Sequence, residues 1–186
     1  YGGQYEQMID TFITLGQALA LAILLVFMVM ASQFESLIHP LVIMVTIPLA
    51  LIGVVIGFLI SGVTISLTSF IGFILLTGIV VNNGIVLVDY INQLRRKGIE
   101  ATAAIIEAGS TRLRPVLITA LTTIFGMLPM VLDSSEGAEM RAPMAITVIG
   151  GLTAATFLTL FVVPSLYSLL ADAGIRRAQR KQLKNV

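Results

Sequence analysis

Long stretches without a charged residue constrain the fold of this chain more than any other feature. Residues 11–34 contain no charged side chain, and neither do residues 36–88. Residues 115–132 and 142–171 form two further charge-free stretches. Because a membrane-spanning helix needs about 20 predominantly apolar residues, these lengths predict an integral membrane protein.

The composition agrees with that prediction and excludes several other classes. Hydrophobic residues make up 57% of the chain and charged residues 11%, whereas a soluble domain carries roughly 25% charged residues. The net charge of +1 gives no general case for nucleic-acid binding. Because the chain has no cysteine and one histidine, His39, it lacks disulfides, thiolate metal sites and motifs that need two histidines.

We expect an all-α membrane protein with five transmembrane helices. The stretch 36–88 is too long for one crossing, and a turn at residues 61–66 divides it. Pro48 lies inside the second span and predicts a kink there. The predicted spans cover residues 11–32, 39–60, 66–90, 112–132 and 143–171.

The basic residues predict the orientation of these spans. They gather around the third loop (Arg95, Arg96, Lys97, Arg112 and Arg114) and in the tail (Arg176, Arg177, Arg180, Lys181 and Lys184). With five crossings, the third loop and the tail fall on the same side, which the positive-inside rule makes cytoplasmic. The N-terminus, the 61–66 turn and the 133–141 loop are then expected outside.

The segments between and beyond the spans also carry expectations. Residues 98–108 read as a short helix on the cytoplasmic surface, with a solvated connector as the alternative. Small residues inside the spans, such as Gly53 and Gly57, predict close packing of helices. The chain begins without Met and without a basic signal-peptide region. We therefore expect a piece of a longer protein, with residues 1–10 as a lead-in and 172–186 as a basic cytoplasmic tail.

Two adjacent amides, Asn82 and Asn83, lie deep in the third span. An unpaired amide in hydrocarbon costs several kcal/mol, so both must face other helices or a water-filled cavity. Asp89 follows Asn82 by seven residues, about 10 Å along the same helix face. Two readings remain open: a polar path for transport, or hydrogen bonds between helices with an interfacial aspartate.

Arg112 and Thr119 are likewise seven residues apart in the fourth span, and Thr122 and Thr123 continue that row. Arg112 is either an anchor that reaches the lipid headgroups, as expected for Arg114, or part of a path for water or protons. A guanidinium would lower the pKa of a nearby carboxylate. The sequence shows no Walker motif and no HExxH or GxSxG motif, so pumping would need an ion gradient or a partner.

These segments resemble the C-terminal membrane part of resistance–nodulation–cell division (RND) transporters, in particular the hydrophobe/amphiphile multidrug efflux branch. The matching segments are MASQFESLIHPLVIMVTIPLALIG (30–53), TGIVVNNGIVLVDYINQLRRKG (77–98), EAGSTRLRPVLITALTTIFGMLPM (107–130) and GGLTAATFLTLFVVPSLYSLL (150–170). Together with the lead-in at residues 2–6 they cover nearly the whole chain.

The resemblance implies that this chain supplies helices eight to twelve of a twelve-helix pump. Such pumps are trimers that let protons in to drive the export of drugs and other amphiphiles. They need no cofactor beyond the proton-motive force. In Gram-negative members a periplasmic adaptor and an outer-membrane channel complete the route. The remaining helices, the porter domains and the drug pocket would lie outside this chain.

The resemblance also implies roles for three residues. Arg112 and Thr119 match the proton-relay arginine and threonine of the eleventh helix. Asn82 occupies the position of a relay lysine in well-studied members, so a lysine–carboxylate pair cannot form here. The relay carboxylates would come from helix four, outside this chain.

Alternatives of other kinds remain. A superfamily relative could carry metal ions or assist protein export, and a membrane anchor or sensor would not transport at all. A metal pump would be expected to carry carboxylates or paired methionines in the tenth helix, and residues 80–88 have neither. We predict no resident metal site and no catalytic residue, since the chain is read as a transporter.

Overall fold

All regular secondary structure in the described part of the chain is α-helical. The computed structural model describes the backbone of residues 2–34 and 38–184, and the side chains of residues 3, 5–34 and 39–166. The helices are α1 (Gly2–Phe34), α2 (Ile38–Met44), α3 (Thr46–Ser61), α4 (Leu67–Arg96), α5 (Ala101–Leu132) and α6 (Ala138–Lys184). Among the described residues, five spans are long and apolar enough to cross a membrane, and one of them is formed by α2 and α3 together. The predicted fold class is confirmed.

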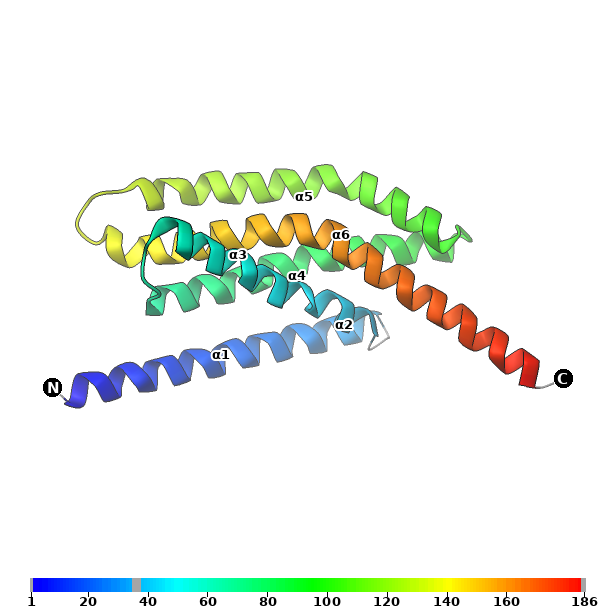
Figure 1. Cartoon of the computed structure of the whole chain (residues 1–186), viewed down its shortest axis with the longest axis horizontal. Helices are drawn as coiled ribbons and strands as arrows, with labels where there is room; N and C mark the ends of the chain where they lie inside the picture. Colours follow the sequence, from blue (N-terminus) through cyan, green and yellow to red (C-terminus); the bar gives the residue numbers. More distant parts are fainter. Residues whose placement is uncertain (1, 35–37, 185–186) are drawn as a thin grey trace.

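The spans alternate in direction (Figure 1). The start of α1, the turn after α3 and the loop between α5 and α6 lie at one end of the bundle. The loop between α4 and α5 lies at the other end, toward which α6 also runs. This arrangement agrees with the predicted grouping of the loops, while the side of the membrane that each end faces stays a prediction.

The second span is broken, as Pro48 predicts. Helix α2 ends at Met44 and α3 begins at Thr46, with Val45 in a turn between them. Pro48 has no N–H to donate to the carbonyl of Met44, one turn earlier. The hydroxyl of Thr46 donates to the carbonyl of Ile43 at 2.6 Å. The proline thus interrupts the hydrogen-bond ladder, and the break falls just before it.

The predicted turn between the second and third spans is present at residues 62–66. Gly62 ends α3 with φ 67°, and its N–H donates to the carbonyl of Phe58 at 3.0 Å. This left-handed conformation suits glycine because a side chain would clash with the backbone there. The hydroxyl of Ser69 accepts from the N–H of Ser66 at 2.9 Å and so caps the start of α4.

Two elements differ from the bounds drawn on the sequence. The helix expected at 98–108 begins at Ala101 and continues without a break into the fourth span, so α5 is one helix of 32 residues. Pro115 is therefore an interior residue rather than one of the first turn. Residues 172–184, expected as a tail, continue α6 as helix, and residues 185–186 lie outside the described residues.

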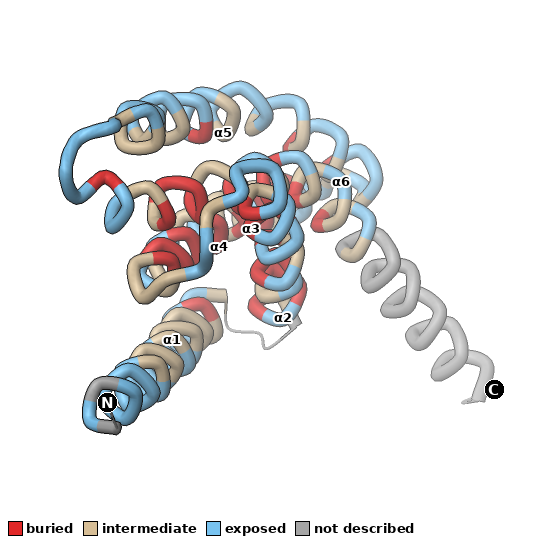
Figure 2. The backbone as a smooth tube through the Cα atoms, turned by 60° about the vertical axis from the view of Figure 1, so that its left-hand side comes forward, coloured by how far each residue is buried: buried red, intermediate tan, exposed pale blue. Residues whose placement is uncertain are grey.

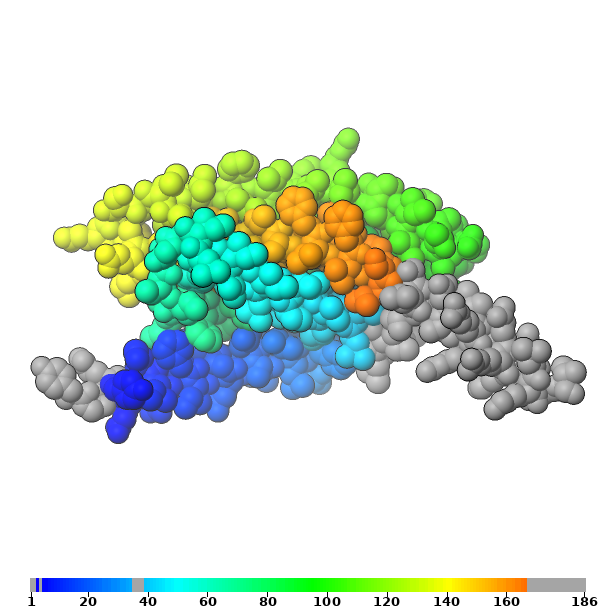
Figure 3. All heavy atoms as spheres, in the orientation of Figure 1, coloured from blue at the N-terminus to red at the C-terminus, as the bar shows by residue number. Residues whose placement is uncertain are grey.

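Glycines bring α3 and α6 into close contact. A Cβ at Gly53 would overlap Cβ of Ala154 and the carbonyl oxygen of Gly150, and a Cβ at Gly150 would come within 2.6 Å of the carbonyl oxygen of Gly53. The prediction of close packing at small residues is confirmed here. Most buried residues lie on α3, α4 and α6 (Figure 2). Helix α1 runs along the edge of the bundle (Figure 3).

Candidate functional site

Arg112 of α5 lies against one face of α4. Its Cζ is 4.9 Å from the centroid of the Tyr90 ring, a distance at which a guanidinium is attracted to the face of an aromatic ring. Asn83, Leu87 and Tyr90 follow one another at intervals of four and three residues, so they share this face of α4. The stack with Tyr90 places the charge between helices rather than at a free surface.

Arg112 and Asn83 line a small cavity between α4, α5 and α6, with a volume of about 10 Å³. The complete lining is Val80, Asn83, Leu87, Arg112, Val116, Leu152, Ala155, Thr156, Thr159 and Leu160. The cavity is largely apolar, and its polar groups are the guanidinium, one amide and two hydroxyls.

The guanidinium has an incomplete set of partners among the described residues. Its Nε is buried and has no hydrogen-bond partner there. The ion pair that the described residues form joins Arg141 to Asp133, at 2.9 Å. Asp89 instead accepts a hydrogen bond from the side chain of Gln93 at 2.7 Å. Arg112 is thus a partly buried charge without a carboxylate partner in this part of the chain.

Asn82 lies on another face of α4 from Asn83. It is exposed, whereas Asn83 is half-buried and lines the cavity with Arg112. Asp89 shares the side of α4 that bears Asn82, seven residues on, and is half-buried. Asn82 and Asp89 therefore share one side of α4, which is open among the described helices, and their part in a polar path stays a prediction.

The threonines of α5 are arranged along its open side. Thr119 and Thr122 are exposed and Thr123 is half-buried. The Thr119 hydroxyl donates to the carbonyl of Pro115 at 2.9 Å, and that of Thr123 donates to the carbonyl of Thr119 at 2.9 Å. Because each proton is used within the helix, the oxygens remain available as acceptors.

Sequence reasoning missed the contribution of α6 and of Tyr90. Thr156 and Thr159 of α6 are buried beside the cavity. Their spacing of three residues was a signal that they share a helix face. Tyr90 stands seven residues after Asn83, a spacing that puts both side chains on one face of α4. The structure shows that Arg112 meets this face.

Known proteins resemble this chain along most of its length. The chain matches the AcrB/AcrD/AcrF family over residues 1–171. The swarming motility protein SwrC of Bacillus subtilis is 41% identical over 91% of the chain and 16% of that relative. The cobalt-zinc-cadmium resistance protein CzcA of Cupriavidus metallidurans is 39% identical over 91% of the chain and 16% of that relative.

Further matches include a multidrug protein and a solved structure. The multidrug resistance protein MdtC of Proteus mirabilis is 40% identical over 88% of the chain and 16% of its own length. A crystal structure of a heavy metal efflux pump superposes with a TM-score of 0.82 at 31% identity, over 91% of this chain and 17% of that one. The chain thus spans about a sixth of these proteins. By its family match and these relatives, the chain belongs to the AcrB/AcrD/AcrF family of RND transporters.

Proposed function

We propose that this chain is the part of a proton-coupled efflux pump that carries the positive half of the proton relay. Arg112 is the observation that supports this most strongly. A charged side chain within a spanning helix is costly unless it is paired, so the presence of Arg112 without a carboxylate partner in the described residues calls for a partner elsewhere. A carboxylate from the rest of the pump is the complementary group.

The open sides of α4 and α5 support this assignment. Asn82, Asp89 and Thr119 are polar or hydroxyl-bearing groups within spans and are not fully buried in the described chain. Such groups are rarely exposed to lipid, so we infer that further helices of the pump cover them. A carboxylate arriving there would be held ionised by Arg112 until a proton reaches it.

The exported cargo is proposed to be a drug or another amphiphile. The relatives include a multidrug resistance protein and a cobalt-zinc-cadmium resistance protein, so they do not decide the cargo class. The support for an amphiphile comes from residues of this chain. Among the described residues no cluster of three His, Cys, Asp or Glu could hold a metal ion. The segment 80–88 carries amides instead of carboxylates, which favours an amphiphile over a metal ion.

We further propose that the pump works as a homotrimer in the bacterial inner membrane, with an adaptor and an outer-membrane channel where the envelope has two membranes. The relatives and the open helix faces are compatible with such an assembly. This chain would contribute helices eight to twelve.

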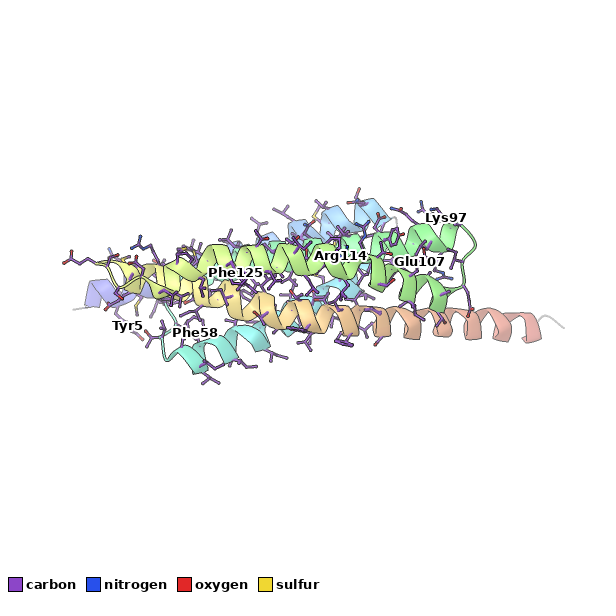
Figure 4. All side chains as sticks on the ribbon, turned by 90° about the horizontal axis from the view of Figure 1, so that it is seen from above. Tyr5, Phe58, Lys97, Glu107, Arg114 and Phe125 are labelled. Carbon is purple, nitrogen blue, oxygen red and sulfur yellow. The ribbon has the colours of Figure 1, made fainter. Side chains whose placement is uncertain are left out.

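The test is the Arg112→Ala variant of the full-length pump in cells that lack other efflux pumps. We expect loss of resistance to amphiphilic drugs with normal amounts of assembled trimer. Arg114→Ala is the matched control, because Arg114 lies two residues away on α5 and is exposed (Figure 4). Unchanged drug resistance in Arg112→Ala, or protection against metal ions alone in the parent pump, would contradict the proposal.

A further inference from the structure

We propose that the cavity beside Arg112 is a binding site for one water molecule, through which Thr156 and Thr159 of α6 position the guanidinium. This inference deepens the proposed function, since it concerns how the relay arginine is held. The two threonines act through Arg112 and are positioning residues.

Arg112 carries a hydrogen-bond donor that is not satisfied in the described part of the chain. The Nε of Arg112 is buried without a partner among the described residues. Leaving such a donor without a hydrogen bond costs about 1–3 kcal/mol, and more when the group is charged. The cation–π contact with Tyr90 attracts the charge to the ring and leaves Nε without a hydrogen-bond partner among the described residues.

The cavity beside Arg112 is about large enough for one water molecule. Its volume of about 10 Å³ is close to that of one water-sized sphere, roughly 10–15 Å³, which is the least that a cavity needs to hold a water molecule. An entirely apolar cavity of this kind would stay dry, but a bound water is favoured where two to four polar groups can reach it.

The hydroxyl groups that line the cavity act as hydrogen-bond acceptors. Thr156 donates its hydroxyl proton to the carbonyl of Leu152 at 2.7 Å, and Thr159 donates to the carbonyl of Ala155. Both hydroxyl oxygens can therefore only accept. A water molecule fits this set, because it can accept from Nε of Arg112 and donate to the threonine oxygens. An anion such as chloride does not fit, since these hydroxyls have no proton left to give it.

Asn83 completes the site from α4, where its amide can donate or accept. The water would thereby join α4, α5 and α6 at the level of the charge. Bridging waters of this type bind nearly as well as direct hydrogen bonds. We expect the water to fix the direction in which the guanidinium faces its carboxylate partner.

The experiment uses the full-length pump and has a structural and a functional arm. A structure at a resolution that shows ordered waters should place one within hydrogen-bond distance of Arg112 Nε and of Thr156 or Thr159 Oγ1. The Thr156→Val and Thr159→Val double variant should lose that water. An empty cavity in the parent pump would overturn the inference.

The functional arm measures proton flux against pH in liposomes. The double valine variant should slow the flux about tenfold, the effect expected for losing a hydrogen bond to a charged group. Its pH profile should also shift to higher pH, because a loosely held guanidinium lowers the pKa of its carboxylate partner less. Serine at both positions should restore rate and profile, since it keeps the hydroxyl oxygens.

Thr147→Val is the matched control. Thr147 is buried on α6 and donates to the carbonyl of Pro143 at 2.8 Å, but it does not line this cavity. A double variant that behaves like Thr147→Val, with an unshifted pH profile, would overturn the inference. If Arg112→Ala keeps its proton flux, the proposed function is contradicted. The water site is then still tested separately, by whether the parent structure shows the ordered water.

Discussion

At the scale of the residue, the adjacent amides Asn82 and Asn83 have different surroundings. One step along a helix turns a side chain by about 100°, because the helix has 3.6 residues per turn. Asn83 lines the cavity with Arg112, whereas Asn82 is exposed on α4. The sequence predicts that both need partners, but it cannot say which face of α4 meets α5, since both faces are apolar around the amides.

Asn82→Ala in the full-length pump should weaken transport without abolishing it. The asparagine can hydrogen-bond to the proposed relay carboxylate, but it carries no charge, so Arg112 supplies the main electrostatic effect. Drug efflux rates measured at matched trimer levels check this. Full efflux in Asn82→Ala would assign Asn82 to packing alone.

At the scale of the element, the sequence predicts the spans better than it predicts where the helices end. The span predicted from the sequence starts at residue 112, yet α5 begins at Ala101 and runs through Gly109, Ser110 and Pro115. The Ser110 hydroxyl donates to the carbonyl of Glu107 at 2.9 Å, and Pro115 removes only the bond to Thr111. A helix that is already formed on both sides tolerates residues with a local preference for a helix end. The sequence of a short segment shows that preference without its surroundings.

The contact between α3 and α6 gives a prediction for stability. Gly53→Ala should destabilise the protein by about 1–3 kcal/mol, the range for overpacking a tight interface. The added Cβ would overlap backbone and Cβ atoms that cannot rotate away. Thermal unfolding in detergent measures the change. Gly126→Ala on α5 is the control, since nothing lies within 4 Å of its added Cβ, and equal melting temperatures for the two variants would contradict the packing described here.

The loop between α5 and α6 gives a prediction for pH. The backbone N–H of Ser135 donates to Asp133 at 2.9 Å, its hydroxyl adds a second bond, and Arg141 lies close, so the pKa of Asp133 is below its usual range. At pH values above the ordinary carboxyl pKa, the ionised Asp133 therefore stabilises the folded loop. This stabilisation is lost as the pH falls through the lowered pKa that Asp133 has in the folded loop.

Asp133→Asn should therefore make the loop more sensitive to protease at neutral pH. The difference from the parent should shrink in acid, where the parent carboxyl is protonated as well. Limited proteolysis at several pH values measures this, and Glu136→Gln in the same loop is the control. A difference that stays constant down to strongly acid pH would rule out the carboxylate as its cause.

At the scale of the whole molecule, the alternation of spans follows from charge-free lengths and turn residues. The sequence could therefore predict the bundle and the grouping of its loops. It could not show how much of α4 and α5 stays uncovered, because that depends on the tertiary packing. The chain spans 16% of relatives such as SwrC and CzcA, and we propose that further helices of the pump cover these faces.

The predicted orientation can be tested by labelling single cysteines in a full-length pump from which any other cysteines have been removed, since this chain itself contributes none. A single cysteine at Ser134 should react in intact cells with a thiol reagent that cannot cross the membrane. A cysteine at Lys97 should react only after the cells are opened, because the basic loop is expected in the cytoplasm. The opposite labelling pattern would invert the topology and place Arg112 near the outer end of its span.

Proton flux through the purified full-length pump in liposomes tests the central claim most directly. An imposed pH gradient of one unit should drive proton movement through the parent pump and through Arg114→Ala at similar rates. Arg112→Ala should reduce that movement to the level of protein-free liposomes while the trimer remains intact. Parent-like proton flux in Arg112→Ala would contradict the account.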